Sequence, residues 1–230
     1  MNRKKAVFVT ATGTDIGKTY VSALLVKKMR EYGLNCGYYK PALSGAIKQK
    51  DGTLLPGDCD FVAKFAGIDI DPNELFSYCF EEAVSPHLAS YRCGINIELT
   101  KIIEDYEKSF DKFDYLLVEG AGGITCPFNL KEENKILLPD VITALDLGIV
   151  IVADGGLGTI NSVLLTVDYA KTHNIKVKGV ILNNYDESNF MHIDNKIQIE
   201  NLTGTKVIAT VAKNETELKI DKNTLEKLFI

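Results

Sequence analysis

Short apolar runs recur along the chain and predict the strands of a buried sheet. The clearest are YLLVEG at 115–120 and GIVIVAD at 148–154, which stay apolar almost throughout. Strands covered on both faces, as in parallel sheets, need such continuous runs. Further runs that predict strands lie at 4–10, 36–41, 175–184 and 206–211.

Between these runs, apolar residues return at helical spacing. Val21, Leu24, Leu25 and Met29 predict a helix that begins near Gly17, reaches about Tyr32 and ends before Gly33. Other helices are expected at about 58–67, 99–110, 137–146, 159–173 and 190–202. This alternation predicts an α/β fold with a doubly wound, mostly parallel sheet, in a single domain over residues 1–230.

Composition narrows the functional classes. The 230 residues are 46% hydrophobic and 25% charged, and the net charge of −5 offers nucleic acid or an anionic membrane no general attraction. The five cysteines form no C-x-x-C pair, so we expect structural thiols in a reducing compartment. The first apolar run, AVFV, is too short for a signal peptide core or a membrane span, which predicts a cytoplasmic protein.

Residues 10–19, TATGTDIGKT, end like a phosphate-binding loop, but the common pattern G-x-x-x-x-G-K-[ST] would place glycine where Thr12 stands. The position between a strand and a helix still favours a nucleotide site, because backbone N–H groups at a helix start bind phosphate. A plain strand–turn–helix junction is the alternative. We therefore predict a variant P-loop in a P-loop NTPase-like fold.

Each residue at the end of this loop has an expected task. Gly13 and Gly17 would adopt unusual backbone angles. Lys18 would supply positive charge, and Thr19 would offer a hydroxyl to Mg²⁺.

A carboxylate ends the strand at 115–120. Glu119 would lie at the carboxyl edge of the sheet, level with the phosphate loop, and Mg²⁺ prefers such oxygen ligands. The neighbouring Gly120, Gly122 and Gly123 leave room for a ligand. An N-cap or a surface acid is the alternative for Glu119.

The segment 41–57, the longest loop-like stretch, is flanked by further candidates. Lys40 ends a buried strand, where lysine needs an anion, although a snorkelling surface lysine is the alternative. Asp58 begins a predicted helix, either as its N-cap or as a second metal carboxylate. Asn183 ends another strand, either reading a base through its amide or forming a turn.

Taken together, these pieces resemble the dethiobiotin synthetase family. The resemblance covers nearly the whole chain through VTATGTDIGKT, YKPALSG, PGD, SPH, VEGAGG, GLGTIN and LNN, in the family's order and spacing. In that family the loop has one residue more than the common form, and the spacing from Ala11 to Gly17 matches. Glycine is usual in the family where Ala11 stands.

The resemblance implies an ATP-dependent enzyme that closes a cyclic urea from 7,8-diaminononanoate and CO₂ or bicarbonate. A substrate amine would form a carbamate, which the γ-phosphate of Mg·ATP converts to a carbamic–phosphoric anhydride that the second amine closes. Such chemistry depends on positioning and charge neutralisation.

The resemblance also implies roles for single residues. Lys18 would hold the β- and γ-phosphates, and Lys40 the carbamate and transferring phosphoryl oxygens. Thr19, Asp58 and Glu119 would bind Mg²⁺, with Ser44 and Gly122 against the substrate. The nucleotide site would comprise Gly13, Thr14, Asp15, Ile16, Gly17, Lys18, Thr19 and Asn183, with Thr14 also near the reacting groups.

In the family, the segment GLGTIN binds the substrate carboxylate across a dimer interface. The matching residues are Leu157, Gly158, Thr159, Ile160 and Asn161, and they imply a homodimer whose substrate site lies at the interface. No nucleic acid or membrane partner is expected.

Two other functions remain open from the residues. A partition or cell-division ATPase would use ATP as a dimerisation switch, but such proteins carry a lysine where Gly13 stands. Another carboxylate-activating or amidating enzyme of this fold is the second alternative, and only the resemblance of YKPALSG and Asp58 argues against it.

Overall fold

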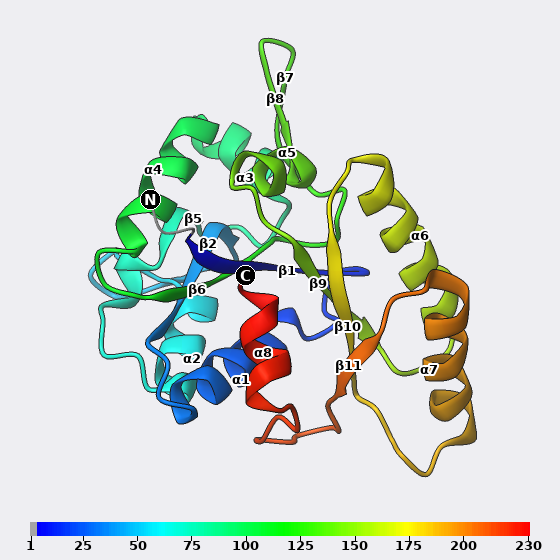
Figure 1. Ribbon diagram of the computed structural model, residues 1–230. Helices are drawn as coiled ribbons and strands as arrows, with labels where there is room; N and C mark the ends of the chain where they lie inside the picture. The colour runs from blue at the N-terminus through cyan, green and yellow to red at the C-terminus, as the bar shows by residue number, and fades with distance from the viewer. Residues whose placement is uncertain (1–3) are drawn as a thin grey trace.

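Seven parallel strands form the central sheet of the computed structural model, which describes residues 4–230 (Figure 1). Their order across the sheet is β11-β10-β9-β1-β6-β2-β5. The strands are β1 (Lys5–Ala11), β2 (Cys36–Ser44), β5 (Phe76–Phe80), β6 (Tyr115–Glu119), β9 (Ile149–Asp154), β10 (Val177–Asn183) and β11 (Val207–Thr210). The α/β class and the parallel sheet predicted from the apolar runs are confirmed.

Helices pack on both faces of the sheet and thereby bury its central strands. In Figure 1, α1, α2 and α8 lie below the sheet, α4 and α5 lie above it, and α6 and α7 pack at the β9–β11 end. The helices are α1 (Lys18–Glu31), α2 (Gly57–Ala66), α3 (Pro86–Cys93), α4 (Leu99–Ser109), α5 (Leu138–Ala144), α6 (Thr159–Thr172), α7 (Phe190–Thr203) and α8 (Lys222–Leu228). A short 3₁₀ turn spans Pro72–Glu74.

The position of β1 determines where a ligand can bind. β1 lies between β6 and β9, and from it the chain goes first to β2 and β5 on one side and later to β9, β10 and β11 on the other. Open α/β sheets bind ligands at the carboxyl ends of the strands where the order reverses in this way. The loops after β1, β2 and β6 meet at that edge.

Several elements were not predicted. They are the edge strand β5, the helix α8, and two hairpins formed by β3 (Ile47–Lys48) with β4 (Leu54–Leu55) and by β7 (Pro127–Lys131) with β8 (Asn134–Leu137). For α3, the proline of SPHLA indicated a helix start but not the extent of the helix. Helix α3 begins at Pro86, directly after Ser85, which is a common arrangement for a first turn.

The expectation that 41–57 is one long loop is wrong. Strand β2 continues through Pro41 to Ser44, and the β3–β4 hairpin occupies most of the remainder. Proline is tolerated inside β2 because β6 pairs with it only as far as Tyr39, so that beyond this residue β2 pairs with β5 alone.

Candidate active site

The phosphate loop connects β1 to α1 and turns sharply before Lys18. Gly17 has a φ of 90°, as expected, but the other left-handed residue is Asp15 at 59°, and Gly13 has no positive φ. The prediction for Gly13 is therefore wrong: the extra residue of this loop places the turn at Asp15. Ala11 is fully buried and still paired with Val152 in the sheet, where a methyl group is accommodated without strain.

Asn183, the last residue of β10, holds the phosphate loop in place. Its amide nitrogen donates to the Ile16 carbonyl at 2.9 Å, and the side chain is buried. A Cβ on Gly17 would lie 2.2 Å from that same nitrogen. Position 17 therefore needs glycine both for its positive φ and for the space that the Asn183 amide occupies. Asn183 has this structural role in addition to its predicted role in base binding.

The glycines after Glu119 bring a second loop against the first. A Cβ on Gly123 would lie 3.4 Å from the Ala11 carbonyl oxygen, and one on Gly120 would lie 2.9 Å from the Phe8 ring. Gly122 has a φ of 57°. The close neighbours of Gly120 and Gly123 are thus the chain's own core and backbone, and room for a ligand beside these glycines stays a prediction.

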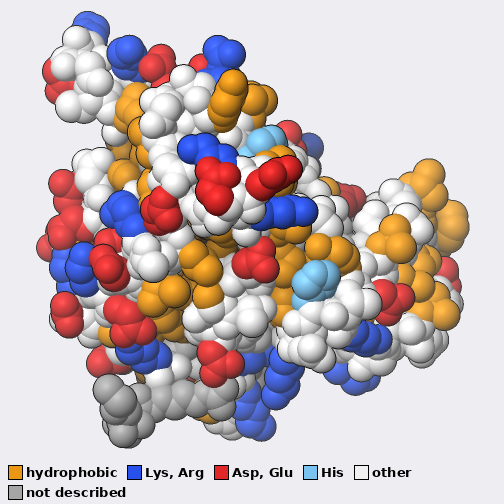
Figure 2. All heavy atoms as spheres, turned by 90° about the horizontal axis from the view of Figure 1, so that it is seen from above, with side chains coloured by type: hydrophobic (Ala, Val, Ile, Leu, Met, Phe, Trp, Pro, Cys, Tyr) orange, Lys and Arg blue, Asp and Glu red, His pale blue; other side chains and the backbone are white. Residues whose placement is uncertain are grey.

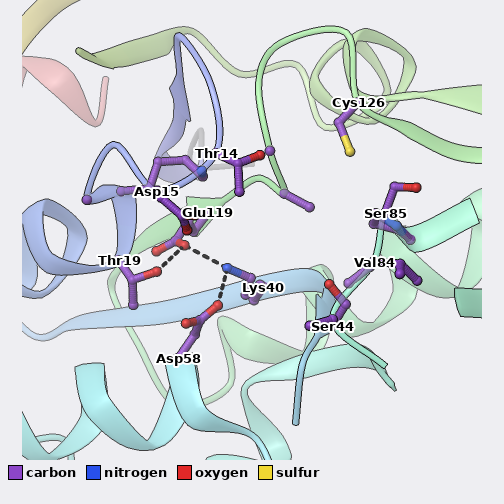
Figure 3. Close-up of a pocket in the computed structure, with 17 residues that line it drawn as sticks. Thr14, Asp15, Thr19, Lys40, Ser44, Asp58, Val84, Ser85, Glu119 and Cys126 are labelled. Atoms are coloured by element: carbon purple, nitrogen blue, oxygen red, sulfur yellow. Dashed lines mark hydrogen bonds and ion pairs between the residues drawn. The ribbon is translucent and has the colours of Figure 1, made fainter. Parts of the chain in front are cut away.

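Four predicted side chains converge beneath the phosphate loop (Figure 3). Lys40 Nζ lies 2.6 Å from Asp58 Oδ2 and 2.7 Å from Glu119 Oε1. The Thr19 hydroxyl donates to the same Glu119 oxygen at 2.8 Å. The alternatives of a surface lysine and a surface glutamate are excluded, since the side-chain exposures are 5% for Lys40 and 0% for Glu119.

A fifth member of this cluster was not predicted. Tyr38, two residues before Lys40, is fully buried, and its hydroxyl donates to Glu119 Oε2 at 3.0 Å. Burial and the Glu119 carboxylate raise the pKa of Tyr38 well above its ordinary value. Both oxygens of Glu119 are thus occupied by donors.

Opposite charges keep Lys40 ionised despite its burial. Burial alone would lower the pKa of Lys40, but the Glu119 and Asp58 carboxylates outweigh it and hold that pKa above its ordinary value. Lys18 stands nearby at the start of α1, and burial lowers its pKa against the opposing effect of Glu119. Two cations and two carboxylates therefore share a site that can bind a polyphosphate.

The cluster opens into a pocket of about 590 Å³. The predicted residues that line it are Thr14, Asp15, Gly17, Lys18, Thr19, Lys40, Ser44, Asp58, Glu119 and Gly122. Ser85 and Pro86 at the start of α3 also line the pocket, although neither was predicted to belong to the site. Cys126, for which only a structural role was expected, lines it too.

The start of α6 lies apart from this pocket. None of Leu157, Gly158, Thr159, Ile160 and Asn161 lines it, among the residues that the structure describes. Gly158 is the N-cap of α6 and has a φ of 87°, so a helix begins here as predicted. Leu157 is 93% exposed. Thr159 is buried, so its side chain faces the interior.

The oxygen donors suit Mg²⁺. One hydroxyl and two carboxylates meet at Thr19, Asp58 and Glu119, and Mg²⁺ takes one or two carboxylates together with phosphate oxygens and water. Within residues 4–230, no group of three or more His, Cys, Asp or Glu side chains is placed to hold a metal. A magnesium site here would therefore need the phosphates of a nucleotide as further ligands.

Comparison with known proteins identifies the family. The chain is 48% identical over 225 residues to the ATP-dependent dethiobiotin synthetase BioD of Clostridium botulinum strain 657, with 98% of each chain covered. The chain belongs to the dethiobiotin synthetase family. The synthetase of Clostridium perfringens strain 13 is 46% identical over 226 residues, again with 98% of each chain covered. A family model described as an AAA domain matches residues 5–218.

Solved structures show how widely the fold is shared. The ParA family ATPase of Chlorobium tepidum matches with a TM-score of 0.55 and 15% identity, over 94% of this chain and 86% of that one. The cell division protein complex MinC:MinD of Aquifex aeolicus matches with a TM-score of 0.52 and 12% identity, over 97% and 86%. At these identities the likeness concerns the fold, and the P-loop NTPase-like architecture is confirmed.

The surface carries charges of both signs. Figure 2 shows acidic and basic side chains interspersed over one face, with no broad single-sign area on the described part of that face. Among residues 4–230, no helix has the length and apolar character needed to cross a membrane.

Proposed function

We propose that this protein is an ATP-dependent dethiobiotin synthetase, a ligase that forms the ureido ring from 7,8-diaminononanoate and CO₂. The observation that carries the proposal is the convergence of Lys18, Thr19, Lys40, Asp58 and Glu119 in one pocket of a chain 48% identical to such enzymes. Residues 1–230 would act as one domain, since buried side chains from both halves of the chain form one core cluster.

The proposed reaction has three steps. An amine of the diamine takes up CO₂, loses a proton and becomes a carbamate. A carbamate oxygen attacks the γ-phosphorus of ATP and releases ADP. The second amine then attacks the carbamoyl carbon, expels phosphate and closes the ring, and the loss of its proton balances the charge.

The residues around the phosphate loop have the character that this reaction needs. Lys18, at the start of α1, would meet the β- and γ-phosphates together with the backbone N–H groups of the loop. Thr19, Asp58 and Glu119 would hold Mg²⁺, which neutralises charge on the phosphate oxygens when it is bound. Thr14 and Asp15, on the exposed side of the loop, would line the path between nucleotide and diamine.

Lys40 is proposed to act on the carbamate. Its ammonium group already lies within 2.7 Å of both cluster carboxylates and on the wall of the pocket. Fixed positive charge in a buried site stabilises the oxyanion that develops in phosphoryl transfer. Ser44 lies four residues after Lys40 on the same face of β2 and would contact the carbamate or the diamine.

We further propose a homodimer in which the start of α6 completes the partner's pocket. This segment lies outside the pocket of its own chain and exposes Leu157 almost fully. Helices α6 and α7 also expose Leu165, Phe190 and Leu202, each at least 60% exposed. Figure 2 shows apolar side chains gathered at one end of the molecule. The five cysteines, all free thiols, support a cytoplasmic location.

The test measures ADP release with Mg·ATP and bicarbonate, with and without 7,8-diaminononanoate, while mass spectrometry follows dethiobiotin. We expect the diamine to stimulate ADP release, with one dethiobiotin formed for each ADP. DNA and anionic vesicles serve as comparison additives. ATPase activity that ignores the diamine and rises with DNA or vesicles would assign the pocket to a switch ATPase and refute the proposal.

A further inference from the structure

The two oxygens of the Glu119 carboxylate have different partners. Oε1 accepts hydrogen bonds from Thr19 and Lys40, at 2.8 and 2.7 Å, and faces the pocket side of the cluster. Oε2 accepts from the Tyr38 hydroxyl at 3.0 Å. The first oxygen therefore shares its surroundings with the metal-site residues, whereas the second is held from within the core.

The alternation of strand β2 places Tyr38 directly below Lys40. Successive side chains of a strand point to opposite faces, so Tyr38, Lys40, Ala42 and Ser44 share one face. The last three line the pocket, while Tyr38 is 0% exposed. The pairing of Tyr38 with Leu117 and of Tyr39 with Val118 brings Glu119 within reach of the hydroxyl.

Core packing alone does not explain this hydroxyl. A phenylalanine ring would fill almost the same volume without the cost of burying a polar group. The hydroxyl is matched instead to a charged acceptor, which gives a stronger hydrogen bond than a neutral one. Its partner, moreover, is the carboxylate that is proposed to hold Mg²⁺.

We propose that Tyr38 is a positioning residue for the metal site, whose hydroxyl fixes the rotation of the Glu119 carboxylate so that Oε1 faces Thr19 and Lys40. This inference rests on the proposed magnesium site and extends it to a residue outside the pocket. Partners that orient a metal-binding carboxylate change metal affinity or activity by about 10- to 100-fold when they are removed.

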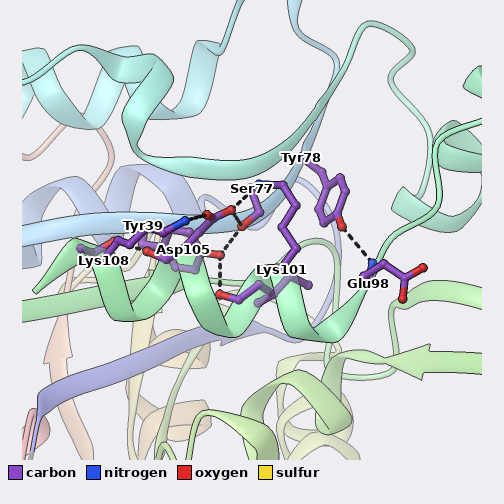
Figure 4. A network of polar contacts seen from close by, with 9 residues as sticks. Tyr39, Ser77, Tyr78, Glu98, Lys101, Asp105 and Lys108 are labelled. Carbon is purple, nitrogen blue, oxygen red and sulfur yellow. Dashed lines mark hydrogen bonds and ion pairs between the residues drawn. The ribbon is translucent and has the colours of Figure 1, made fainter.

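The test uses Tyr38→Phe with Tyr39→Phe as its matched control. Tyr39 is the next residue of β2, is buried to the same degree, and points to the opposite face. Its hydroxyl contacts the Ser77 hydroxyl at 2.6 Å and donates to the Ile102 carbonyl at 3.0 Å, in a network that includes Asp105 (Figure 4). Each variant thus loses one buried tyrosine hydroxyl, but only the first loses a contact with Glu119.

The readout is binding of Mn²⁺, a paramagnetic substitute for Mg²⁺, in the presence of ADP and followed by the electron paramagnetic resonance signal of free Mn²⁺. We expect Tyr38→Phe to raise the Mn²⁺ dissociation constant at least about tenfold. Tyr39→Phe is expected to leave it within twofold of the parent. The midpoint of thermal unfolding, measured for both variants, reports any shared structural cost.

Equal Mn²⁺ affinity in the parent and Tyr38→Phe would overturn the proposal, whatever happens to stability. An equal loss of affinity in both variants would also overturn it, because the effect would then follow any buried hydroxyl. The experiment does not depend on the identity of the product. If weakened Mn²⁺ binding is found but no dethiobiotin forms, the positioning role stands and the proposed reaction falls.

Discussion

At the scale of single residues, the buried ion pairs of Lys40 are the main determinant of the site. One ammonium group pairs with both Asp58 and Glu119, in surroundings where an unpaired charge is costly. The same ammonium group is the candidate to neutralise the carbamate. A variant that also removes the charge of Glu119 can therefore separate the contribution of Lys40 to stability from its contribution to catalysis.

Replacement of Lys40 tests both contributions. We expect Lys40→Met to lower dethiobiotin formation by at least about 100-fold, because the developing oxyanion loses its cation. The free energy of unfolding should fall by about 3 kcal/mol, because Glu119 stays buried without its partner. ADP binding, measured by calorimetry, should stay within threefold of the parent.

The double variant Lys40→Met, Glu119→Gln provides the control. Since both buried charges are removed, we expect part of the lost stability to return while activity stays absent. Undiminished activity in Lys40→Met would contradict the catalytic role. Failure of the double variant to regain stability would contradict the account of the buried pair.

Cys126 lines the pocket, but its thiol is held in the protonated form. Burial raises its pKa to about 11, so at pH 8 about one thiol in a thousand is ionised. We expect iodoacetamide to label Cys126 at least about tenfold more slowly than the exposed Cys93, as measured by peptide mass spectrometry. Labelling of both cysteines at the same rate would show that the pocket ionises the Cys126 thiol after all.

At the scale of elements, the phosphate loop and the strand β10 that supports it act together. Gly17 must adopt a left-handed backbone and must also leave space for the Asn183 amide. The amide in turn holds the loop through the Ile16 carbonyl. The geometry of the loop, which follows β1, thus depends on a strand that lies two places away from β1, beyond β9.

The variant Gly17→Ala should disturb this arrangement. A Cβ at 2.2 Å from Asn183 Nδ2 forces the loop or the asparagine to move. We expect ADP affinity, measured by calorimetry, to fall at least about tenfold, because misplacing the backbone N–H groups removes phosphate contacts worth at least 1.4 kcal/mol.

Gly33→Ala is the matched control at the other end of α1. Gly33 also has a positive φ, of 76°, but a Cβ there would meet no atom within 4 Å. We expect it to lower stability by about 1 kcal/mol, as a left-handed alanine does, and to leave ADP binding unchanged. If both variants bind ADP alike, the contact with Asn183 does not shape the loop.

At the scale of the whole molecule, the proposed substrate site draws on two separate regions of the fold. The charged cluster lies at the carboxyl ends of β2 and β6, whereas the segment expected to bind the substrate carboxylate begins α6. A dimer would join the cluster of one protomer to the α6 start of its partner. This arrangement has a consequence that can be measured with two inactive variants.

Mixing these variants should restore activity. Lys40→Met removes the cluster's function, and Asn161→Asp places a negative charge at the exposed α6 start, where it would repel a substrate carboxylate. After co-expression, half of the dimers would be mixed and one of their two sites intact, so we expect about a quarter of the parent activity. If each site lies within one chain, the mixture stays as inactive as its components.

Much of the fold followed from local pattern. Buried parallel strands such as β6 and β9 need continuous apolar runs, and these runs marked their positions within a few residues. Strand β5 at the sheet edge and the β7–β8 hairpin carry weaker patterns, because only part of each is buried. Strands β3 and β4 contain no buried residue. Helix α3 is eight residues long, too short for a clear helical period, although Ser85 and Pro86 marked its start.

The sequence by itself determined the cluster's main members. Lys18 and Thr19 follow from a loop motif, and Lys40 and Glu119 from charged residues that end buried strands, where the parallel sheet must bring them to one edge. These inferences need only local chemistry and the rule that parallel strands share a carboxyl edge.

Only the tertiary structure decided how those members touch. That Asp58 and Glu119 share one lysine depends on how α2 packs beside β2. That Tyr38 holds the second oxygen of Glu119 depends on strand register, which no local pattern encodes when β2 and β6 are both buried almost throughout. Cys126 reaches the pocket because Gly122 turns the chain back toward it, through a left-handed backbone that the tertiary contacts impose.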